Sequence, residues 1–270
     1  MIKLIACDMD GTLLTSDKRL PEDLFAVLEK LRARGVQFAV ASGRQYGSLR
    51  RDFEALVPHI LFICENGALV MKNDERQFIE PLDPADLPRI IAVSRTMQGV
   101  YPAICCAGEA LMEETAPAHF LTSMQIHYKN TRIVPDLMAC AHVTDACKVC
   151  FYSDAPAQDT SLPVLQRELG DRLSIIHSDV NWVDVMKPGV NKGRAMQALY
   201  AQLGITPDEA MAFGDYLNDC ELLESVTESY AMENAHPRLK AMAKHIAPSN
   251  DENGVMRVIR EKVLSENDHC

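Results

Sequence analysis

The sequence predicts an α/β protein: a Rossmann-like parallel sheet core with helices on both faces, plus a second α/β domain inserted into it. Strands alternate with helices of ten or more residues in the first 80 and last 80 residues, which is typical of a parallel sheet covered on both faces. Between them this alternation is lost, and proline-containing, linker-like segments lie at both borders. We therefore expect residues 1–82 and 189–270 to form the core and residues 83–188 to form the insertion.

The first part of the chain alternates cleanly. We expect a strand at Lys3–Asp8, a helix opened by Pro21 and stopped at Gly35, a strand at Val36–Ala41, a helix at Tyr46–Leu56 and a strand at Ile60–Cys64. The turn Glu65-Asn66-Gly67 then leads into a hairpin.

The last part resumes the pattern, and the insertion mixes short elements. For the last part we expect helices at Asn191–Leu203, Asn218–Val226, Pro237–Ala243 and Asp251–Leu264, and strands at Ala210–Phe213 and Ser229–Met232. For the insertion we expect helices at Ala85–Met97 and Ser161–Leu169 and strands at Val149–Tyr152, Leu173–Ile176 and Trp182–Met186, in an order that the sequence leaves open.

Charge and composition exclude several classes of function. The 270 residues include 38 acidic and 27 basic ones, a formal charge of −11 with no basic stripe, which disfavours nucleic acid and anionic membranes as partners. The first apolar run ends at Asp8, too early for a signal peptide, and no run reaches the roughly 20 apolar residues of a membrane helix. We expect a cytoplasmic protein, a monomer or weak homodimer, that acts on a small molecule.

The nine cysteines indicate no disulfide framework, since their number is odd and their spacing irregular. One cluster, Cys140, His142, Cys147 and Cys150, contains the C-x-x-C spacing of zinc sites. However, the segment around Cys147 reads as a strand, in which residues three apart point to opposite faces. We favour structural cysteines over a metal site there.

Reactive side chains follow three predicted strands of the core. Asp8 ends the first strand, Ser42 follows the second, and Asp215 follows the strand that begins at Ala210. Ligands of open parallel sheets bind beyond the carboxyl ends of the strands. These distant segments should therefore meet at one edge.

The chemistry expected at that edge is anionic and oxygen-rich. Asp8, Asp10 and Asp215 suit a hard cation such as Mg²⁺, which would offset their repulsion of a phosphate. The Gly43 N–H at a strand-to-helix turn favours an anion, and Lys192 near a helix start supplies a positive charge.

The motifs resemble those of the haloacid dehalogenase superfamily of phosphatases. Asp8-Met9-Asp10-Gly11-Thr12 is similar to its first motif, Ala41-Ser42-Gly43-Arg44 to its second, Lys192 in Gly189-Val190-Asn191-Lys192-Gly193 to its third, and Gly214-Asp215-Tyr216-Leu217-Asn218-Asp219 to its fourth. Together with Met232-Glu233-Asn234-Ala235 and the segment Ser249–Val255, they resemble the Cof-type branch with an α/β cap.

The resemblance implies a role for each matching residue. Asp8 would be the nucleophile that forms an aspartyl-phosphate, and Asp10 the general acid and then the general base. Mg²⁺ would be held by Asp8, the Asp10 carbonyl and Asp215, with Asp219 close behind. The phosphoryl oxygens would be held by Ser42, Gly43, Lys192, Asn218 and the Met9 N–H, with Arg44 a candidate for reading the substrate.

Each motif alone has a plainer explanation. Asp-x-Asp-Gly can be a turn, Ser42 a helix cap, Lys192 a surface lysine and Arg44 half of a surface ion pair. Their joint occurrence in order at strand ends favours the functional interpretation. We expect hydrolysis of sugar phosphates or phosphorylated cofactors. The alternatives are a phosphomutase using the same intermediate and, less favoured because Asp10 could activate water, a phospho-acceptor or sensor without turnover.

Overall fold

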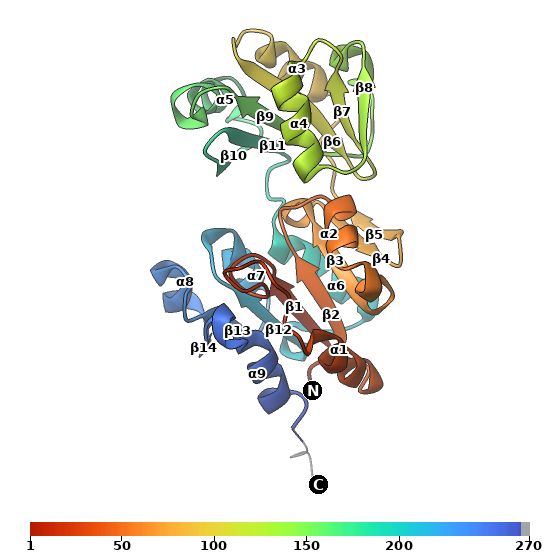
Figure 1. Cartoon of the computed structure of the whole chain (residues 1–270), viewed down its shortest axis with the longest axis vertical. Coiled ribbons are helices and arrows are strands. Elements are labelled where there is room, and N and C mark those ends of the chain that lie inside the picture. Colours follow the sequence, from red (N-terminus) through yellow and green to blue (C-terminus); the bar gives the residue numbers. More distant parts are fainter. Residues whose placement is uncertain (266–270) are drawn as a thin grey trace. The chain divides into compact units, whose positions relative to one another are not determined.

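The computed structural model describes residues 1–265, which form two compact units (Figure 1). The eight-stranded unit comprises residues 1–43, 53–78 and 191 onward. The six-stranded unit comprises residues 44–52 and 79–190. The chain therefore leaves the first unit and returns to it, so that each unit has its own sheet.

The sheet of the eight-stranded unit is mostly parallel. Its strands, in the spatial order β14-β13-β12-β1-β2-β3-β4-β5, are β14 His245–Ala247, β13 Glu228–Met232, β12 Ala210–Gly214, β1 Leu4–Asp8, β2 Gln37–Ala41, β3 Ile60–Cys64, β4 Leu69–Lys72 and β5 Glu75–Ile79. The neighbours from β14 to β3 pair in parallel, and β4 pairs antiparallel to β3, as the expected hairpin requires. The predicted fold class is confirmed.

Helices cover both faces of this sheet (Figure 1). They are α1 Leu24–Ala33, α6 Lys192–Leu203, α7 Cys220–Glu224, α8 Pro237–Met242 and α9 Gly254–Lys262. The chain moves from β1 to β2 through α1, and in the opposite direction from β12 to β13 through α7. Because parallel crossovers are right-handed, these two helices lie on opposite faces, with α9 beside α1 and α6 beside α7.

Local sequence explains where the helices begin and end. In α1 the buried residues Leu24, Val27, Leu28 and Leu31 recur at helical spacing. Helix α6 begins after Asn191, whose side chain accepts a hydrogen bond from the Arg194 N–H at 2.8 Å, and it ends at Gly204 in the left-handed conformation.

Several predicted helix bounds were too generous. Helix α1 begins at Leu24 rather than Pro21, because the residues before it form turns. The helix expected to reach Leu56 is α2 Tyr46–Asp52 followed by a 3₁₀ segment that contains Pro58. The last helix begins only at Gly254, because Asn253 adopts a left-handed φ of 58°.

The helices predicted at Asn218–Val226 and Ala85–Met97 are also shorter than expected. The first is a 3₁₀ turn, Leu217–Asp219, followed by α7. The second is α3, Leu87–Ser94, whose last turn is followed by turn residues.

The six-stranded unit has a mostly antiparallel sheet. Its strands, in the order β10-β11-β9-β6-β7-β8, are β10 Ser174–Asp179, β11 Trp182–Met186, β9 Ala146–Ser153, β6 Val100–Cys106, β7 Ala110–Glu113 and β8 Thr131–Val134. Its helices are α2, α3, α4 Ala118–His127 and α5 Ser161–Leu169. Sequence patterns had indicated β9, β10 and β11 but neither β6 to β8 nor α4.

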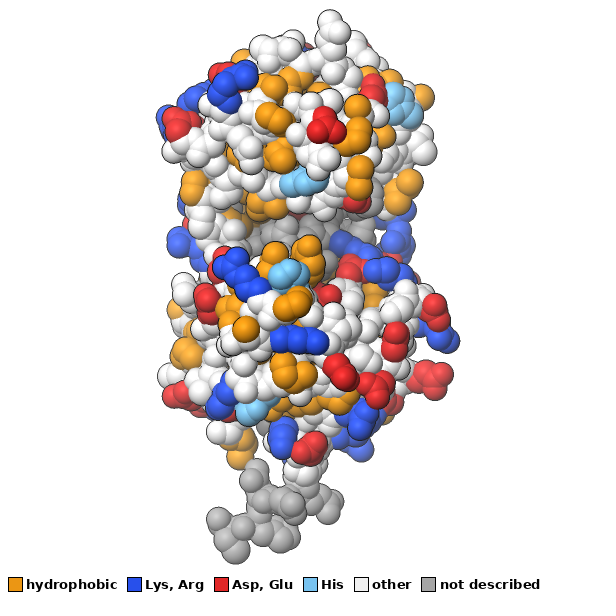
Figure 2. Space-filling view, turned by 90° about the vertical axis from the view of Figure 1, so that its left-hand side faces the viewer, with side chains coloured by type: hydrophobic (Ala, Val, Ile, Leu, Met, Phe, Trp, Pro, Cys, Tyr) orange, Lys and Arg blue, Asp and Glu red, His pale blue; other side chains and the backbone are white. Residues whose placement is uncertain are grey.

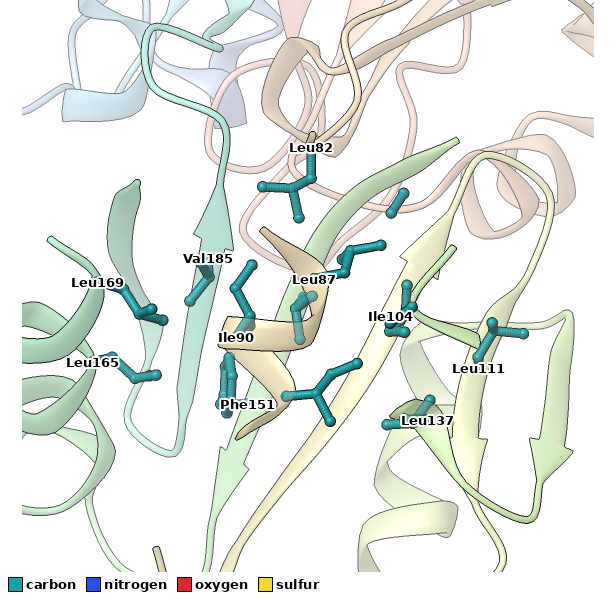
Figure 3. Close-up of a cluster of buried hydrophobic side chains, with 14 of the residues drawn as sticks. Leu82, Leu87, Ile90, Ile104, Leu111, Leu137, Phe151, Leu165, Leu169 and Val185 are labelled. Atoms are coloured by element: carbon teal, nitrogen blue, oxygen red, sulfur yellow. The ribbon is translucent and has the colours of Figure 1, made fainter. Parts of the chain in front are cut away.

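Each face of this sheet has its own apolar core. On one face, shown in Figure 3, Leu87 and Ile90 of α3 and Leu165 of α5 pack with Phe151 and other strand residues. On the opposite face, buried residues of α4 pack with Ala103, Cys105 and Cys150. The six-stranded unit therefore has apolar cores of its own, one on each face of its sheet.

On the face drawn in Figure 2, acidic and basic side chains lie interspersed. In the described part of the chain, no helix combines the length and the apolar character that crossing a bilayer requires.

Candidate active site

The carboxyl ends of three strands bring predicted residues to one edge of the eight-stranded sheet. Strand β1 ends at Asp8, while Ser42 directly follows β2 and Asp215 directly follows β12. Strand β1 lies between β12 and β2, where successive crossovers leave in opposite directions. This is the switch point at which doubly wound sheets bind ligands.

A buried lysine joins two of the carboxylates. The Lys192 Nζ donates to Asp8 Oδ1 at 2.5 Å and to Asp219 Oδ1 at 2.6 Å. The side chains of Lys192 and Asp219 are both 0% exposed. Burying charges is unfavourable unless each has partners, and here one ammonium group serves two carboxylates.

Burial and mutual repulsion shift the titration of this group. Burial raises the pKa of Asp8 well above its usual range, the charge of Asp219 raises it further, and Lys192 opposes both. For Lys192, burial alone would lower the pKa, but Asp219 and Asp8 outweigh it and hold the pKa above its ordinary value. The lysine therefore stays protonated.

Three carboxylates lie close enough to share a cation. Ligand oxygens of Asp8, Asp215 and Asp219 all lie within 4.8 Å of one another. The Thr12 hydroxyl donates to Asp215 Oδ1 at 3.0 Å, and burial raises the pKa of Asp215. Their excess negative charge and oxygen-only donors fit a hard divalent ion.

No second group of this kind occurs among residues 1–265. The cluster of Cys140, His142, Cys147 and Cys150 does not assemble as a set of metal ligands there. Instead Cys150 lies in the core of the six-stranded unit, with its Sγ 3.5 Å from that of Cys105.

The loop after β1 is held by the C-terminal part of the chain. Asn234 Nδ2 donates to the Gly11 carbonyl at 2.8 Å, and Asn250 Nδ2 donates to the Leu14 carbonyl at 2.9 Å. Gly11 has a φ of 82°, and a Cβ there would lie 2.3 Å from Asp215 Oδ2. Only glycine fits this approach of backbone to carboxylate.

The remaining predicted residues are placed less tightly. The Asp10 side chain is 37% exposed and pairs with Lys18 Nζ at 2.8 Å, outside the group of three carboxylates. Met9 and Ser42 are buried, and Asn218 is exposed in the turn before α7.

Gly43 and Arg44 lie at the border between the units. Gly43 belongs to the eight-stranded unit and Arg44 to the six-stranded unit. Arg44 NH1 pairs with Asp52 Oδ2 at 3.2 Å, which is the plain surface role that the sequence had left open.

Comparison with known proteins agrees with this geometry. Residues 5–259 match the family of haloacid dehalogenase-like hydrolases. The chain belongs to this family.

Its relatives match along nearly their whole length. A 5-amino-6-(5-phospho-D-ribitylamino)uracil phosphatase of Escherichia coli is 31% identical, covering 97% of this chain and 96% of the relative. An HMP-PP phosphatase of Klebsiella pneumoniae is 32% identical, covering 93% and 91%. A solved structure from Eubacterium rectale has a TM-score of 0.88 at 27% identity, covering 96% and 98%. The prediction of a haloacid dehalogenase-type phosphatase is thus confirmed.

Sequence reasoning about this haloacid dehalogenase-like chain left several site contacts unassigned. Thr12 stands inside the first motif but received no role, although its hydroxyl holds Asp215. Asn234 and Asn250 lie in segments whose resemblance was noted without a function. For Asn234 the available signal was its place just after a predicted strand, since an asparagine amide can satisfy loop carbonyls.

Proposed function

We propose that this protein is a Mg²⁺-dependent phosphatase that hydrolyses small phosphate esters through an aspartyl-phosphate on Asp8. One observation carries the proposal: the Asp8 carboxylate is buried at a strand end between Lys192 and the partner carboxylates Asp215 and Asp219. Such a carboxylate is held in place by an ammonium group for attack on phosphorus rather than left to solvent.

The bond changes that we propose combine this position of Asp8 with the role that the family resemblance implies for Asp10. An Asp8 oxygen attacks the phosphorus, the ester P–O bond breaks, and Asp10 gives its proton to the leaving alcohol. Water then attacks the phosphorus of the aspartyl-phosphate while Asp10 takes a proton from it, so that inorganic phosphate leaves and Asp8 is restored. Lys192, whose Nζ lies 2.5 Å from Asp8 Oδ1, would orient the attacking carboxylate.

The metal and phosphate ligands follow the resemblance. Asp8, Asp215 and the Asp10 backbone carbonyl would hold Mg²⁺, with Asp219 close behind. When bound, the ion neutralises charge on the transferring phosphoryl group. The phosphoryl oxygens would contact Ser42, Gly43, Lys192, Asn218 and the Met9 N–H, with Arg44 available to the rest of the substrate.

We assign substrate choice to the insertion, residues 83–188, acting as a cap on the core formed by 1–82 and 189–270. Two relatives are named as phosphatases of 5-amino-6-(5-phospho-D-ribitylamino)uracil and of HMP-PP, which are small phosphorylated compounds. Sugar phosphates and phosphorylated cofactors are therefore the classes to try first. The cysteines of the described residues are all free thiols, which supports action in the reducing cytoplasm.

A phosphate-release assay tests the proposal. The purified protein should release phosphate from members of a phosphorylated-metabolite panel with Mg²⁺ and lose this activity in EDTA. Asp8→Asn should reduce the rate on the order of a thousandfold or more, since the nucleophile is lost. Asp17→Asn removes an exposed carboxylate and is the matched control.

Three outcomes would overturn the proposal. Full activity in the Asp8→Asn protein would show that another group attacks phosphorus. A positional isomer of a sugar phosphate, instead of free phosphate, would make the enzyme a phosphomutase. A stable aspartyl-phosphate without turnover would indicate a phospho-acceptor.

A further inference from the structure

A turn with unusual backbone geometry follows β3 at the active-site edge of the eight-stranded sheet. Glu65, Asn66 and Gly67 have φ values of 49°, 53° and 102°. Two of these three consecutive left-handed residues are not glycine, although side chains disfavour that conformation. The turn between β4 and β5 uses two such residues, Asn73 and Asp74, so the run of three after β3 is longer than its neighbour's, and its contacts on both sides are the feature that sets it apart.

On one side the turn holds the segment after β2. The Asn66 N–H donates to the Ser42 carbonyl at 3.1 Å. A Cβ built on Gly43 would lie 3.0 Å from Asn66 Oδ1 and 3.1 Å from its Nδ2, so the amide lies against Gly43. Asn66 thus contacts both members of the proposed phosphate anchor that follows β2.

On the other side the turn supports the start of α6. A Cβ on Gly67 would lie 2.1 Å from the Asn191 carbonyl oxygen and 2.9 Å from the Lys192 nitrogen. Asn191 caps α6, and Lys192 is the first residue of that helix. The same three-residue turn therefore lies between the Ser42–Gly43 anchor and the backbone that carries the buried lysine.

The Asn66 side chain has an unmet hydrogen-bonding capacity. Among residues 1–265, its buried Oδ1 has no hydrogen-bond partner. A buried amide oxygen without a partner is unfavourable and calls for an explanation. A function for the Asn66 amide in fixing the Ser42–Gly43 anchor would explain why the chain keeps this unpaired oxygen beside Gly43.

We propose that Asn66 is a positioning residue of the phosphatase site, which sets the place of the Ser42–Gly43 anchor relative to Lys192. This inference rests on the proposed function, because it concerns how a phosphate group is held. The backbone conformation at Asn66 makes the turn, and its amide fixes the anchor.

The Asn66→Gly variant separates these two contributions. Glycine adopts a positive φ readily, so the turn survives while the amide is lost. Asn73→Gly is the matched control, because Asn73 has a φ of 51° in the turn between β4 and β5 and is exposed. Both proteins should melt close to the wild-type temperature.

The measurements are kcat, KM and the inhibition constant of inorganic phosphate, with p-nitrophenyl phosphate as substrate and Mg²⁺ present. We expect Asn66→Gly to lower kcat/KM by about tenfold to a hundredfold, since small misplacements of positioned groups have effects of this size. It should also weaken phosphate inhibition by about tenfold, while Asn73→Gly changes neither. A merely structural role would lower the active fraction and leave the inhibition constant unchanged.

A second variant keeps the test decisive if Asn66→Gly is unstable. Asn66→Asp retains the shape of the side chain but places a negative charge beside Gly43, so it should weaken phosphate inhibition more strongly still. If the wild type is active and both Asn66 variants have phosphate inhibition constants within twofold of the wild-type value, this inference is overturned and the proposed function stands. If the wild type releases no phosphate, the proposed function fails. In that case calorimetry measures the binding of inorganic phosphate to the wild type and to the Asn66 variants. Equal affinities in these proteins, or no binding to any of them, overturn the proposed role of Asn66.

Discussion

At the scale of single residues, the site is built around excess negative charge. Lys192 balances one charge among Asp8, Asp215 and Asp219, so further positive charge is needed when all three are ionised. The pKa values of Asp8 and Asp215 are raised because burial and repulsion between the carboxylates oppose the ionisation of both. The same imbalance that is unfavourable for the protein alone makes the site selective for a cation.

Gly11→Ala should disable the site by crowding one of its carboxylates. The new Cβ would meet Asp215 Oδ2 at 2.3 Å, so Asp215 or the loop must move. We expect kcat/KM for phosphate release to fall by about a hundredfold, as for other displaced catalytic groups. Steady-state kinetics across a Mg²⁺ titration checks this, and the half-saturating Mg²⁺ concentration should rise.

The control for this change is Gly35→Ala. Gly35 has a φ of 71° with nothing within 4 Å of its Cβ position, so alanine there adds backbone strain alone. It should lower the free energy of unfolding by about 1 kcal/mol without altering kinetics. If the two variants lost activity equally, strain rather than the Asp215 contact would be responsible.

At the scale of elements, the sequence identified what local patterns determine. The parallel strands β1, β2, β3 and β12 are short apolar runs ended by turn residues, so both their type and their reactive ends were predictable. The antiparallel strands of the insertion were harder. Strand β6 contains Pro102, which argues against a central strand. On one side of β6, Pro102 pairs with β9. On the other side, β7 pairs only with Ile104 and Cys105 and does not reach Pro102, so no hydrogen bond from a backbone N–H is needed there.

The insertion also contains a buried ion pair that no sequence pattern revealed. Lys148 of β9 donates to Asp184 of β11 at 2.9 Å, and both side chains are less than 10% exposed. Asp184→Asn removes the charge that balances a buried ammonium group, so it should destabilise the protein by about 3–5 kcal/mol. Denaturant unfolding measures this change.

A double variant isolates the cause. Lys148→Met combined with Asp184→Leu removes both charges and should leave stability within about 2 kcal/mol of the wild type. If the double variant were as unstable as Asp184→Asn, packing at these positions rather than charge balance would explain the loss.

At the scale of the whole molecule, the candidate site belongs to one unit. Its residues come from both ends of the chain, which the parallel sheet brings together, and this convergence followed from strand order and motifs. The contacts made by Asn66, Asn234 and Asn250 depend on loop geometry that only the folded chain defines. The substrate stays open for the same physical reason, because side chains of loops and sheet faces, rather than motifs, shape its pocket.

Because the candidate metal ligands all lie in the eight-stranded unit, the effect of metal binding on each unit can be measured separately. Mg²⁺ at about 100 times its dissociation constant should stabilise the unit that binds it by about 2.7 kcal/mol and raise its melting temperature by roughly 5–10 °C. The sequence has one tryptophan, Trp182, which lies in β11 of the six-stranded unit. We therefore expect Mg²⁺ to raise the midpoint followed by far-ultraviolet circular dichroism while the midpoint of tryptophan fluorescence stays in place.

Asp215→Asn is the control, because it removes one of the three carboxylates and should abolish the Mg²⁺-dependent rise. A wild-type protein whose melting ignores Mg²⁺ would contradict the metal site itself. Equal shifts of both signals would instead mean that the two units unfold together. In that case their separate cores would not make them separate cooperative units, and metal bound at Asp8 would stabilise the insertion as much as the sheet that carries the site.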